Sequence, residues 1–472
     1  MRNRILAVLF LFVFFATVPA WATKKWTDPS HLKFPPLRFS PPAVEAEKLP
    51  SGLRVFLLEN HDLPLVQVTI FVRGGGMYDP PGKEGLAEIT AQTMRTGGAG
   101  NMTGDAVSAY LDGIAAYVEP AVRDEYAVWR INVPSQDLST LWQIFRAMMR
   151  EPRFEVEKIK TALSLKKEEL KRIYDNPEKL AFREFQRLYF RGNVRGRLAS
   201  EKSIESIRRE DVIEFHRRHY FPANMMMAIS GDVKKREILS LLEKDLLPGW
   251  ENGGPLPSTP PPIWSPQKRL YCLIKELPQA VIITGQPAPH RLSPDYHPFE
   301  ILDFIVGSGG FRSRIFQEVR TNKGLSYATG SFYRARNDYG LFVTYAITQN
   351  RSVPLAFSTI KHILGGVKEN ITEEELKRAK GSIINSFVFT YATPHNVVER
   401  QLETAFFGWP EDFWSKYIER VSLVSLKDVK RVARDYLFPD KMQVFVLGNT
   451  DGCTPLSNQY PDREMVNLKN DK

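Results

Sequence analysis

Two sequence patterns recur in this chain, and the matched positions within each pattern are separated by a constant distance along the sequence. In the first pattern the matched positions are Asp211-Val212 and Asp428-Val429, Phe221-Pro222 and Phe438-Pro439, Met225 and Met442, and Gly231 and Gly448. In the second, at a nearly equal distance, GLAEITAQTMRTGG (85–98) aligns with HPFEILDFIVGSGG (297–310). Self-similarity over this length is typical of duplicated domains rather than of short solenoid units, so the sequence predicts two domains of one fold.

Each half combines short strands with long helices. Alternating apolar residues indicate strands, and an apolar period near 3.6 indicates amphipathic helices. The expected strands are 53–58, 66–72 and 126–133, and the expected long helices are 138–149, 155–174 and 177–189. This pattern predicts an α+β fold of two duplicated α/β-sandwich domains, each with an antiparallel-rich sheet that carries helices on one face.

Composition sets the expected domain limits. We expect an N-terminal domain at 45–250 and a C-terminal domain at 266–450. The segment between them, 251–265, contains GGPLPSTPPP, which cannot continue a helix or a central strand, so we expect a stiff extended linker. Residues 451–472 are polar and are expected to form a loose tail.

The N-terminus has the composition of a secretory signal peptide. Arg2 and Arg4 precede an apolar run at 5–16, and Ala20-Trp21-Ala22 places small residues at both positions that a signal peptidase reads. The run is shorter than the roughly 20 apolar residues that a membrane-spanning helix needs. We therefore expect cleavage after Ala22, a periplasmic location and no membrane span in the mature chain.

Charge and cysteine content exclude two other classes of protein. The formal net charge of +10 falls to +8 without Arg2 and Arg4, and the excess is spread over the whole chain with no nucleic-acid motif, so we expect no nucleic-acid partner. Cys272 and Cys453 are the only cysteines, which excludes a disulfide-rich scaffold. Whether these two form one bridge stays open.

The helix expected after Gly85 resembles the zinc-binding helix of the pitrilysin, insulinase and mitochondrial processing peptidase family. Members of that family carry G-L-A-H-x-x-E-H, in which two His side chains on one helix face bind zinc and the Glu is the general base. Here Gly85-Leu86-Ala87 is kept, but Glu88 and Gln92 occupy the His positions and Ala91 occupies the general-base position. The resemblance implies a zinc site from which the chemistry has been removed.

The family's third zinc ligand, a distant Glu, is retained. Glu169 follows Gln92 at the distance that the family uses, and Glu168-Glu169 followed by Asp175-Asn176-Pro177 resembles the family's E-E-(x)-D-x-P stretch. One carboxylate out of three ligands is not expected to hold zinc. We therefore expect no metal and no cofactor on this chain, and no catalysis by it in isolation.

The second half resembles the family's other signature, G-G-G-x-x-S-R-L-F-x-E-V-R-x-x-x-G-L-x-Y. Residues 307–332 read GSGGFRSRIFQEVRTNKGLSYATGSF and match it in register. By this resemblance, Arg320 would donate hydrogen bonds to peptide carbonyls, and the Tyr327 hydroxyl would support the oxyanion of the tetrahedral intermediate. Gly307, Gly309 and Gly310 are expected either to form a tight helix-to-helix turn or to contact the peptide backbone closely.

A purely structural role remains an alternative for the Arg-Tyr pair, with Arg320 at a helix end and Tyr327 half-buried in a strand. The first half also departs from the family at its substrate-pairing strand, because Ile114-Ala115-Ala116 stands where L-N-A is usual. A peptide added there as an extra strand would be held by backbone groups alone.

His216 and His219 lie three residues apart on one helix, a spacing compatible with metal ligands. Arg217 and Arg218 between them, and an exposed helix end, favour two solvated histidines instead.

Three functions are compatible with a chain that has lost the zinc-binding residues of its first half and has kept the substrate-binding Arg320 and Tyr327 of its second half. Family members of this length act as two-subunit clamshells in which one chain lacks zinc. The resemblance therefore implies an exported, non-catalytic, substrate-binding subunit of a heteromeric zinc metallopeptidase, whose partner carries H-x-x-E-H and the zinc. The alternatives are a stand-alone peptide-binding or scaffold protein, and an active metallopeptidase with an altered metal site.

Overall fold

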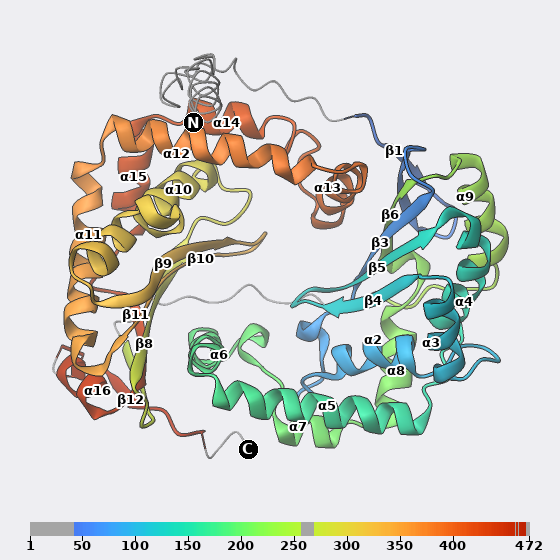
Figure 1. The fold of residues 1–472 in the computed structure, drawn as a ribbon, viewed down its shortest axis with the longest axis horizontal. Helices are drawn as coiled ribbons and strands as arrows, with labels where there is room; N and C mark the ends of the chain where they lie inside the picture. The colour runs from blue at the N-terminus through green and yellow to red at the C-terminus, as the bar shows by residue number, and fades with distance from the viewer. Residues whose placement is uncertain (1–41, 256–268, 458, 461, 469–472) are drawn as a thin grey trace, which may run out of the picture. The chain divides into compact units, whose positions relative to one another are not determined.

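The fold is built on two β-sheets of six strands each (Figure 1). In this computed structural model the described residues are 42–255, 269–457, 459–460 and 462–468. The first sheet, in the order β1-β2-β6-β3-β5-β4, consists of β1 (Glu45–Lys48), β2 (Arg54–Glu59), β3 (Leu65–Arg73), β4 (Tyr117–Val122), β5 (Tyr126–Pro134) and β6 (Met225–Gly231). The second, in the order β12-β7-β11-β8-β10-β9, consists of β7 (Arg269–Ile274), β8 (Gln279–Ala288), β9 (Ser326–Ala335), β10 (Gly340–Gln349), β11 (Gln443–Gly448) and β12 (Arg463–Met465).

The two sheets confirm the predicted duplication and fold class. The strand series β2-β6-β3-β5-β4 of the first sheet has the same order along the chain as β7-β11-β8-β10-β9 of the second. In both series the first pair is parallel and the remaining pairs are antiparallel. The first of the two repeated patterns falls on a helix followed by a central strand in each half, α8 (Arg209–His219) with β6, and α15 (Leu426–Tyr436) with β11.

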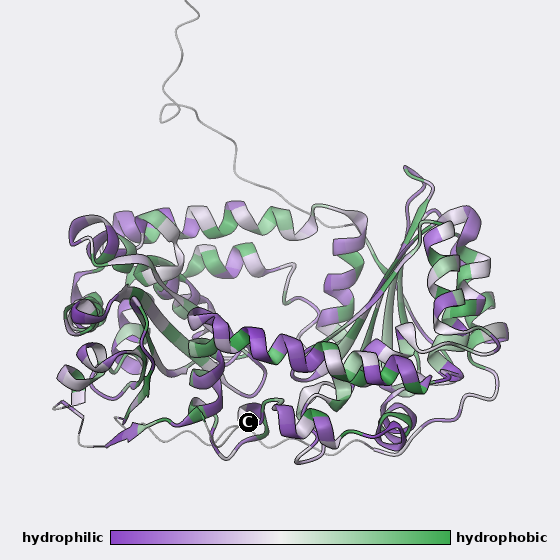
Figure 2. Cartoon of the chain, turned by 60° about the horizontal axis from the view of Figure 1, so that its bottom comes forward, coloured by the Kyte–Doolittle hydropathy of each residue, from purple (hydrophilic) through white to green (hydrophobic). Residues whose placement is uncertain are grey.

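Helices cover the first sheet on the face that carries Val68, Ile70 and Trp129, all nearly inaccessible to solvent. The helices of the first half, with α8, are α2 (Leu86–Thr96), α3 (Gly104–Gly113), α4 (Leu138–Arg150), α5 (Val156–Asp175), α6 (Pro177–Tyr189), α7 (Glu201–Ser206) and α9 (Lys235–Leu241). The sheet strands are mainly hydrophobic, whereas most helices alternate hydrophobic and hydrophilic residues around their axes (Figure 2). Each helix therefore buries one side, as its 3.6-residue period requires.

The second half of the chain also carries a series of helices. Together with α15 they are α10 (Tyr296–Asp303), α11 (Val353–Asn370), α12 (Glu373–Phe387), α13 (Pro394–Phe407), α14 (Tyr417–Leu423) and α16 (Thr450–Ser457). A π-helical segment, Phe316–Asn322, precedes β9. Such segments are found frequently at functional sites.

The other face of each sheet is covered by a helix from the other half of the chain. α6 packs its apolar side against β7, β8, β10 and β11 of the second sheet. α13 packs Val398, Leu402 and Phe406 against the first sheet, on the face opposite to the first-half helices. The sequence did not predict this exchange, because a helical period identifies an apolar face but not the sheet on which it packs. α6 thus lies inside the predicted N-terminal range 45–250 while it completes the core of the second sheet.

The expectation of a loose C-terminal tail is wrong for the described residues after 450. They form α16, and β12 then pairs in parallel with β7. Cys453, Leu456 and Tyr460 are each at most 2% exposed. A few well-spaced apolar residues are enough to bury a segment whose average composition is polar. Two other predicted segments cannot be compared, because the signal peptide at 1–22 and most of the linker at 251–265 lie outside the described residues.

The two cysteines lie together in the second half as free thiols. Cys272 belongs to β7 and Cys453 to α16, and both are buried. A hydrogen bond between the thiols, together with burial, raises the pKa of the Cys453 thiol.

His216 and His219 are not solvated, in contrast to the expectation. His216 Nε2 lies 2.8 Å from the carbonyl oxygen of Met149, and His219 Nδ1 lies 3.2 Å from that of Arg73. Burial lowers the pKa of each imidazole to about 4, against the backbone hydrogen bond, which raises it. α8 turns His216 and His219 inward and leaves Arg217 and Arg218 exposed, a division between helix faces that residue charge alone does not reveal.

Acid should therefore destabilise the fold at these two histidines. Their pKa in the folded chain lies below the ordinary value of 6.5, so the stability they contribute is complete above pH 6.5 and is lost as the pH falls toward 4. Each accounts for up to about 3 kcal/mol of the free energy of unfolding. Chemical denaturation at pH 7 and pH 4.5 measures the loss. The double variant His216→Gln/His219→Gln should reduce the pH dependence, and the exposed control His290→Gln should not. Equal pH dependence in all three proteins would contradict this prediction.

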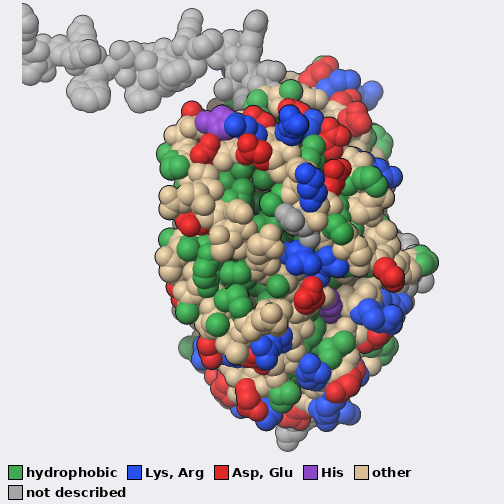
Figure 3. Space-filling view, turned by 90° about the vertical axis from the view of Figure 1, so that its right-hand side faces the viewer, with side chains coloured by type: hydrophobic (Ala, Val, Ile, Leu, Met, Phe, Trp, Pro, Cys, Tyr) green, Lys and Arg blue, Asp and Glu red, His purple; other side chains and the backbone are tan. Residues whose placement is uncertain are grey.

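No helix in the described part of the chain is long and apolar enough to cross a membrane. On the right-hand side of the molecule as drawn in Figure 1, basic and acidic side chains are interspersed (Figure 3).

Candidate functional site

The helix α2 is held at its N-terminus by a buried carboxylate. Asp79 accepts hydrogen bonds from Gly85 N–H at 2.7 Å and from Ala87 N–H at 2.8 Å. Gly85 itself has φ +104°, a backbone conformation that favours glycine. Burial raises the pKa of Asp79 to about 7, although the two N–H donors act in the opposite direction. Sequence reasoning missed Asp79, which fixes the start of the helix that carries Glu88.

The structure brings together the four residues of the predicted zinc-site remnant. Glu88, Ala91 and Gln92 on α2, and Glu169 on α5, line one pocket of about 540 Å³. Residues 119–122 of the edge strand β4 form its opposite wall. Ala91 is 1% exposed and offers only a methyl group at the general-base position. The remnant therefore has the position of a catalytic centre, but its general-base position holds no group that could accept a proton from water.

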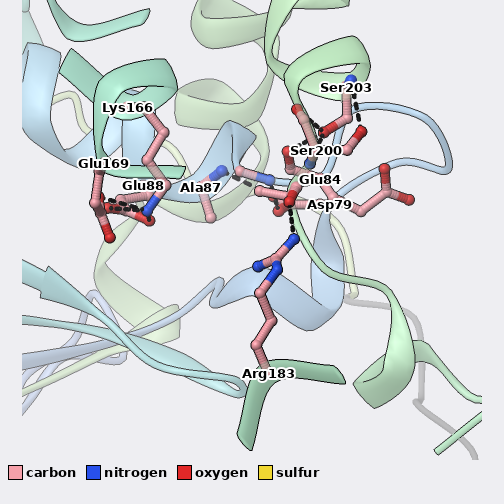
Figure 4. Close-up of polar contacts among 11 residues, drawn as sticks. Asp79, Glu84, Ala87, Glu88, Lys166, Glu169, Arg183, Ser200 and Ser203 are labelled. Carbon is pink, nitrogen blue, oxygen red and sulfur yellow. Dashed lines mark hydrogen bonds and ion pairs between the residues drawn. The ribbon is translucent and has the colours of Figure 1, made fainter. Parts of the chain in front are cut away.

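A lysine ammonium lies between the two remaining carboxylates. Lys166 Nζ is 2.7 Å from Glu88 Oε2 and 3.0 Å from Glu169 Oε2 (Figure 4). The Lys166 side chain is only 11% exposed. Burial alone would lower the pKa of Lys166, but attraction to and hydrogen bonds with Glu88 and Glu169 outweigh it, and the pKa is raised. A positive charge facing both carboxylates is thus supplied by the protein itself.

These residues do not fit a zinc ion. Zinc sites of this class use three protein ligands and leave one position for water. Here Gln92 replaces an imidazole, and Lys166 already engages both oxygens of Glu88 and one oxygen of Glu169. Among the described residues there is no group of three or more His, Cys, Asp or Glu side chains that could hold a metal ion.

Arg320 and Tyr327 lie together on the second half. The Arg320 guanidinium is 5.3 Å from the centre of the Tyr327 ring and 4.8 Å from that of Phe316. Tyr327 is 75% exposed, on the edge strand β9, so the half-buried alternative does not describe it. Its hydroxyl has no hydrogen-bond partner among the described residues. Neither Arg320 nor Tyr327 lines the pocket of Glu88 and Glu169.

Gly309 forms the turn between two helical segments, Phe304–Ser308, which contains Gly307, and Gly310–Arg312, which begins at Gly310. A Cβ added to Gly307 would lie 2.3 Å from Ser331 Oγ, so this position requires glycine for packing against β9. Gly310 has φ +64° and is exposed, and Gly309 lies between them at the turn.

The segment before β4 keeps the backbone conformation that suits Asn, although Ala115 stands at that position. Ala115 adopts φ +51°, a left-handed conformation in which Asn is several-fold enriched over most residues. Ala115 precedes the edge strand β4, whose outer side pairs with no strand in the described residues.

Two family models match the chain. Residues 54–200 match the model described as Insulinase (Peptidase family M16), and residues 206–383 match the model described as Peptidase M16 inactive domain. The two matches together span well over half of the 472 residues.

Two individual relatives each share about a quarter of their aligned residues with this chain. An uncharacterized zinc protease of Rickettsia bellii is 26% identical over 345 residues, which cover 71% of this chain and 81% of that protein. A non-peptidase homolog, YmxG, of Helicobacter pylori is 24% identical over 384 residues, which cover 79% of this chain and 86% of the homolog.

The fold has a solved counterpart in a crystal structure described as a peptidase M16 inactive domain from Pseudomonas fluorescens. It is 20% identical, covers 86% of this chain and 98% of its own, and has a TM-score of 0.77. The duplicated sheets, the zinc-helix remnant and the two matched models lead to one conclusion: the chain belongs to the insulinase (M16) peptidase family, as a member that lacks the H-x-x-E-H motif.

Proposed function

We propose that this chain is an exported, non-catalytic, substrate-binding subunit of a heteromeric zinc metallopeptidase, and that it supplies Arg320 and Tyr327 to a zinc-bearing partner. The observation that carries the proposal is the ammonium of Lys166 between Glu88 and Glu169. A lysine ammonium held by both carboxylates competes with a metal ion for them. Hydrolysis must then take place at a zinc ion on another chain.

The exposed Arg-Tyr pair supports action on a partner. The Tyr327 hydroxyl is free among the described residues and three-quarters of its side chain is exposed. The stacked guanidinium of Arg320 holds the ring and keeps donors of its own. A phenol in this position would donate to an oxyanion that forms outside this chain.

The edge strand β4 supports peptide binding by strand addition. An edge strand exposes unpaired backbone N–H and C=O groups on its outer side. Pro120 within β4 lacks an N–H, which is tolerated at an edge and removes one donor from the row. A bound peptide would lie beside the pocket of Glu88 and Glu169.

The two alternative functions predict different experimental results. A stand-alone peptide-binding protein would bind peptide without any partner and would give no gain of activity in a complex. An active peptidase with an altered metal site would need a base, and Ala91 provides none.

Co-expression with a homologue that carries H-x-x-E-H tests the proposal. Size-exclusion chromatography should show a joint complex, and that complex should cleave peptides faster than the homologue alone. The matched control replaces the base Glu of the partner's motif, which should abolish cleavage and leave assembly intact. A homologue that is equally active with and without this chain would contradict the proposal.

We propose that the chain is exported to the periplasm, and this proposal makes one specific prediction. Mature protein recovered from the periplasm should begin at Thr23, because the signal peptidase reads Ala20 and Ala22. N-terminal sequencing or intact mass measurement checks the cleavage point. Ala22→Leu should slow processing, and recovery of uncleaved leader in soluble cytoplasmic protein would contradict export.

A further inference from the structure

A second pocket, of about 430 Å³, adjoins the zinc-site remnant and is rich in arginine. It shares Glu88, Val122, Lys166 and Glu169 with the remnant's pocket, so the two pockets are neighbours. We call it the arginine pocket after five of its lining residues. They are Arg123 from the β4–β5 turn, Arg183 from α6, Arg197 from the loop after α6, Arg334 from β9, and Arg336 from the turn that follows β9.

The arginine pocket has more positive than negative charge available to a ligand. Seven cationic and five carboxyl side chains line it, and Glu88 and Glu169 are both occupied by Lys166. Among the described residues, Arg123, Arg197 and Arg334 form no ion pair with a carboxylate. Arg183 approaches only Glu184, at 4.0 Å, and Glu184 is itself paired with Arg187 at 2.7 Å. These four guanidinium groups are therefore not neutralised by a carboxylate of their own.

Two of these guanidinium groups carry a buried donor that no atom of the described residues accepts. Arg183 Nε and Arg197 Nε are buried and have no hydrogen-bond partner in that part of the chain. Their other nitrogens donate to backbone oxygens, Arg183 to Ala199 and Arg197 to Asp79 at 3.1 Å. Figure 4 shows Arg183 extending from α6 toward the segment that carries Asp79 and Glu84. A buried N–H without an acceptor is costly, and an anionic ligand in the pocket would remove that cost.

The neighbouring acidic residues neutralise only part of the positive charge of the arginine pocket. Asp124 lines the pocket, and Glu125 follows it in the β4–β5 turn, outside the pocket lining. Burial alone would lower the pKa of Arg336, but Tyr339, Glu125 and Asp124 raise it, so this guanidinium is partly compensated. Arg195 is fully engaged: it donates to Asp338 at 2.6 Å and stacks over the Tyr339 ring at 5.0 Å. This contact ties the loop after α6 to the β9–β10 turn, and so fixes the pocket's walls.

We propose that the arginine pocket binds a carboxylate of the peptide, so that this subunit selects peptides with an acidic side chain or a free C-terminus near the segment held by β4. This inference rests on the proposed function, since it assumes that peptide lies along β4. Guanidinium groups match carboxylates in geometry and form paired, charge-assisted hydrogen bonds. A carboxylate from a peptide beside the neighbouring pocket would meet Arg123 and Arg334 and would give the buried Nε donors an acceptor.

Titration calorimetry of the mature full-length chain with three ten-residue peptides tests this. All are built from Ala, Ser, Gly and Val with one central residue: Glu with an amidated C-terminus, Gln with an amidated C-terminus, and Gln with a free C-terminus. At least one carboxylate peptide should bind about tenfold to a hundredfold more tightly than the neutral peptide. The peptide that gains affinity identifies whether the side chain or the C-terminus supplies the carboxylate.

Amino-acid substitutions distinguish carboxylate binding in the arginine pocket from a general attraction of acidic peptides to a basic protein. Arg123→Gln/Arg334→Gln should bring the carboxylate peptide to the affinity of the neutral one, and Arg334→Lys should keep part of the preference. Arg351→Gln, at a side chain 89% exposed, is the matched control and should change nothing. A preference that survives the double variant, or equal binding of all three peptides, overturns this inference and leaves peptide binding intact. Failure of every peptide to bind, the neutral one included, contradicts the proposed function as well.

Discussion

Tyr327→Phe should lower the turnover of the reconstituted complex about a hundredfold while assembly is unchanged. One preorganised donor to a developing oxyanion contributes about 3 kcal/mol to transition-state stabilisation, and the substitution removes only the hydroxyl. The ring stays under Arg320, so the local packing is retained. The measurement is kcat for a peptide substrate, with size-exclusion chromatography as the check on assembly.

Arg320→Ala should act differently at the same site. Hydrogen bonds to peptide carbonyls are made in the ground state as well as in the transition state, so their loss should raise KM more than it lowers kcat. Phe311→Ala, at a neighbouring exposed ring, is a suitable control for the surface itself. If Tyr327→Phe and Arg320→Ala both leave the kinetics of the complex unchanged, the pair has a structural role only.

Zinc binding should be restorable, and Lys166 should oppose the restoration. Glu88→His/Ala91→Glu/Gln92→His rebuilds the family motif beside Glu169. In that triple variant Lys166 still lies 3.0 Å from Glu169 and competes with the metal for its third ligand. Adding Lys166→Met should therefore tighten zinc binding about tenfold to a hundredfold, the effect of one charge-assisted hydrogen bond.

The zinc affinities of the triple and quadruple variants, from competition with a chromophoric chelator, decide this point. Glu169→Ala in the quadruple variant is the control and should abolish tight binding. Equal affinity with and without Lys166→Met would show that the ammonium does not block the site.

The repeat made the architecture predictable. Positions such as Gly231 and Gly448 end equivalent central strands, so matching them between the two halves of the chain is equivalent to matching the sheets. Family resemblance then grouped Glu88, Ala91, Gln92 and Glu169 correctly, because the spacing along α2 and the distance to α5 are features of the fold.

Features that depend on packing between distant segments were not predictable in the same way. The apolar period of α6 and of α13 predicts a buried helix face, but it does not predict that each helix packs on the sheet of the other half. His216 and His219 were misjudged because their exposed neighbours, Arg217 and Arg218, dominate the local composition. Charged residues on one face of a helix do not determine the burial of residues on the other face.

Lys166 is the one important residue that the sequence could have revealed. It precedes Glu169 by three residues on α5, so both side chains lie on one face of the helix. A lysine beside an expected zinc ligand is a signal against metal binding. Its contact with Glu88, 78 residues away along the chain, requires the folded arrangement of α2 and α5.

The metal content of the purified mature chain tests the central claim most directly. Elemental analysis after dialysis against metal-free buffer should find far less than one zinc per chain, and the same preparation should cleave no peptide, because Lys166 holds the carboxylates and Ala91 offers no base. About one zinc per chain, lost on Glu169→Ala, would contradict it.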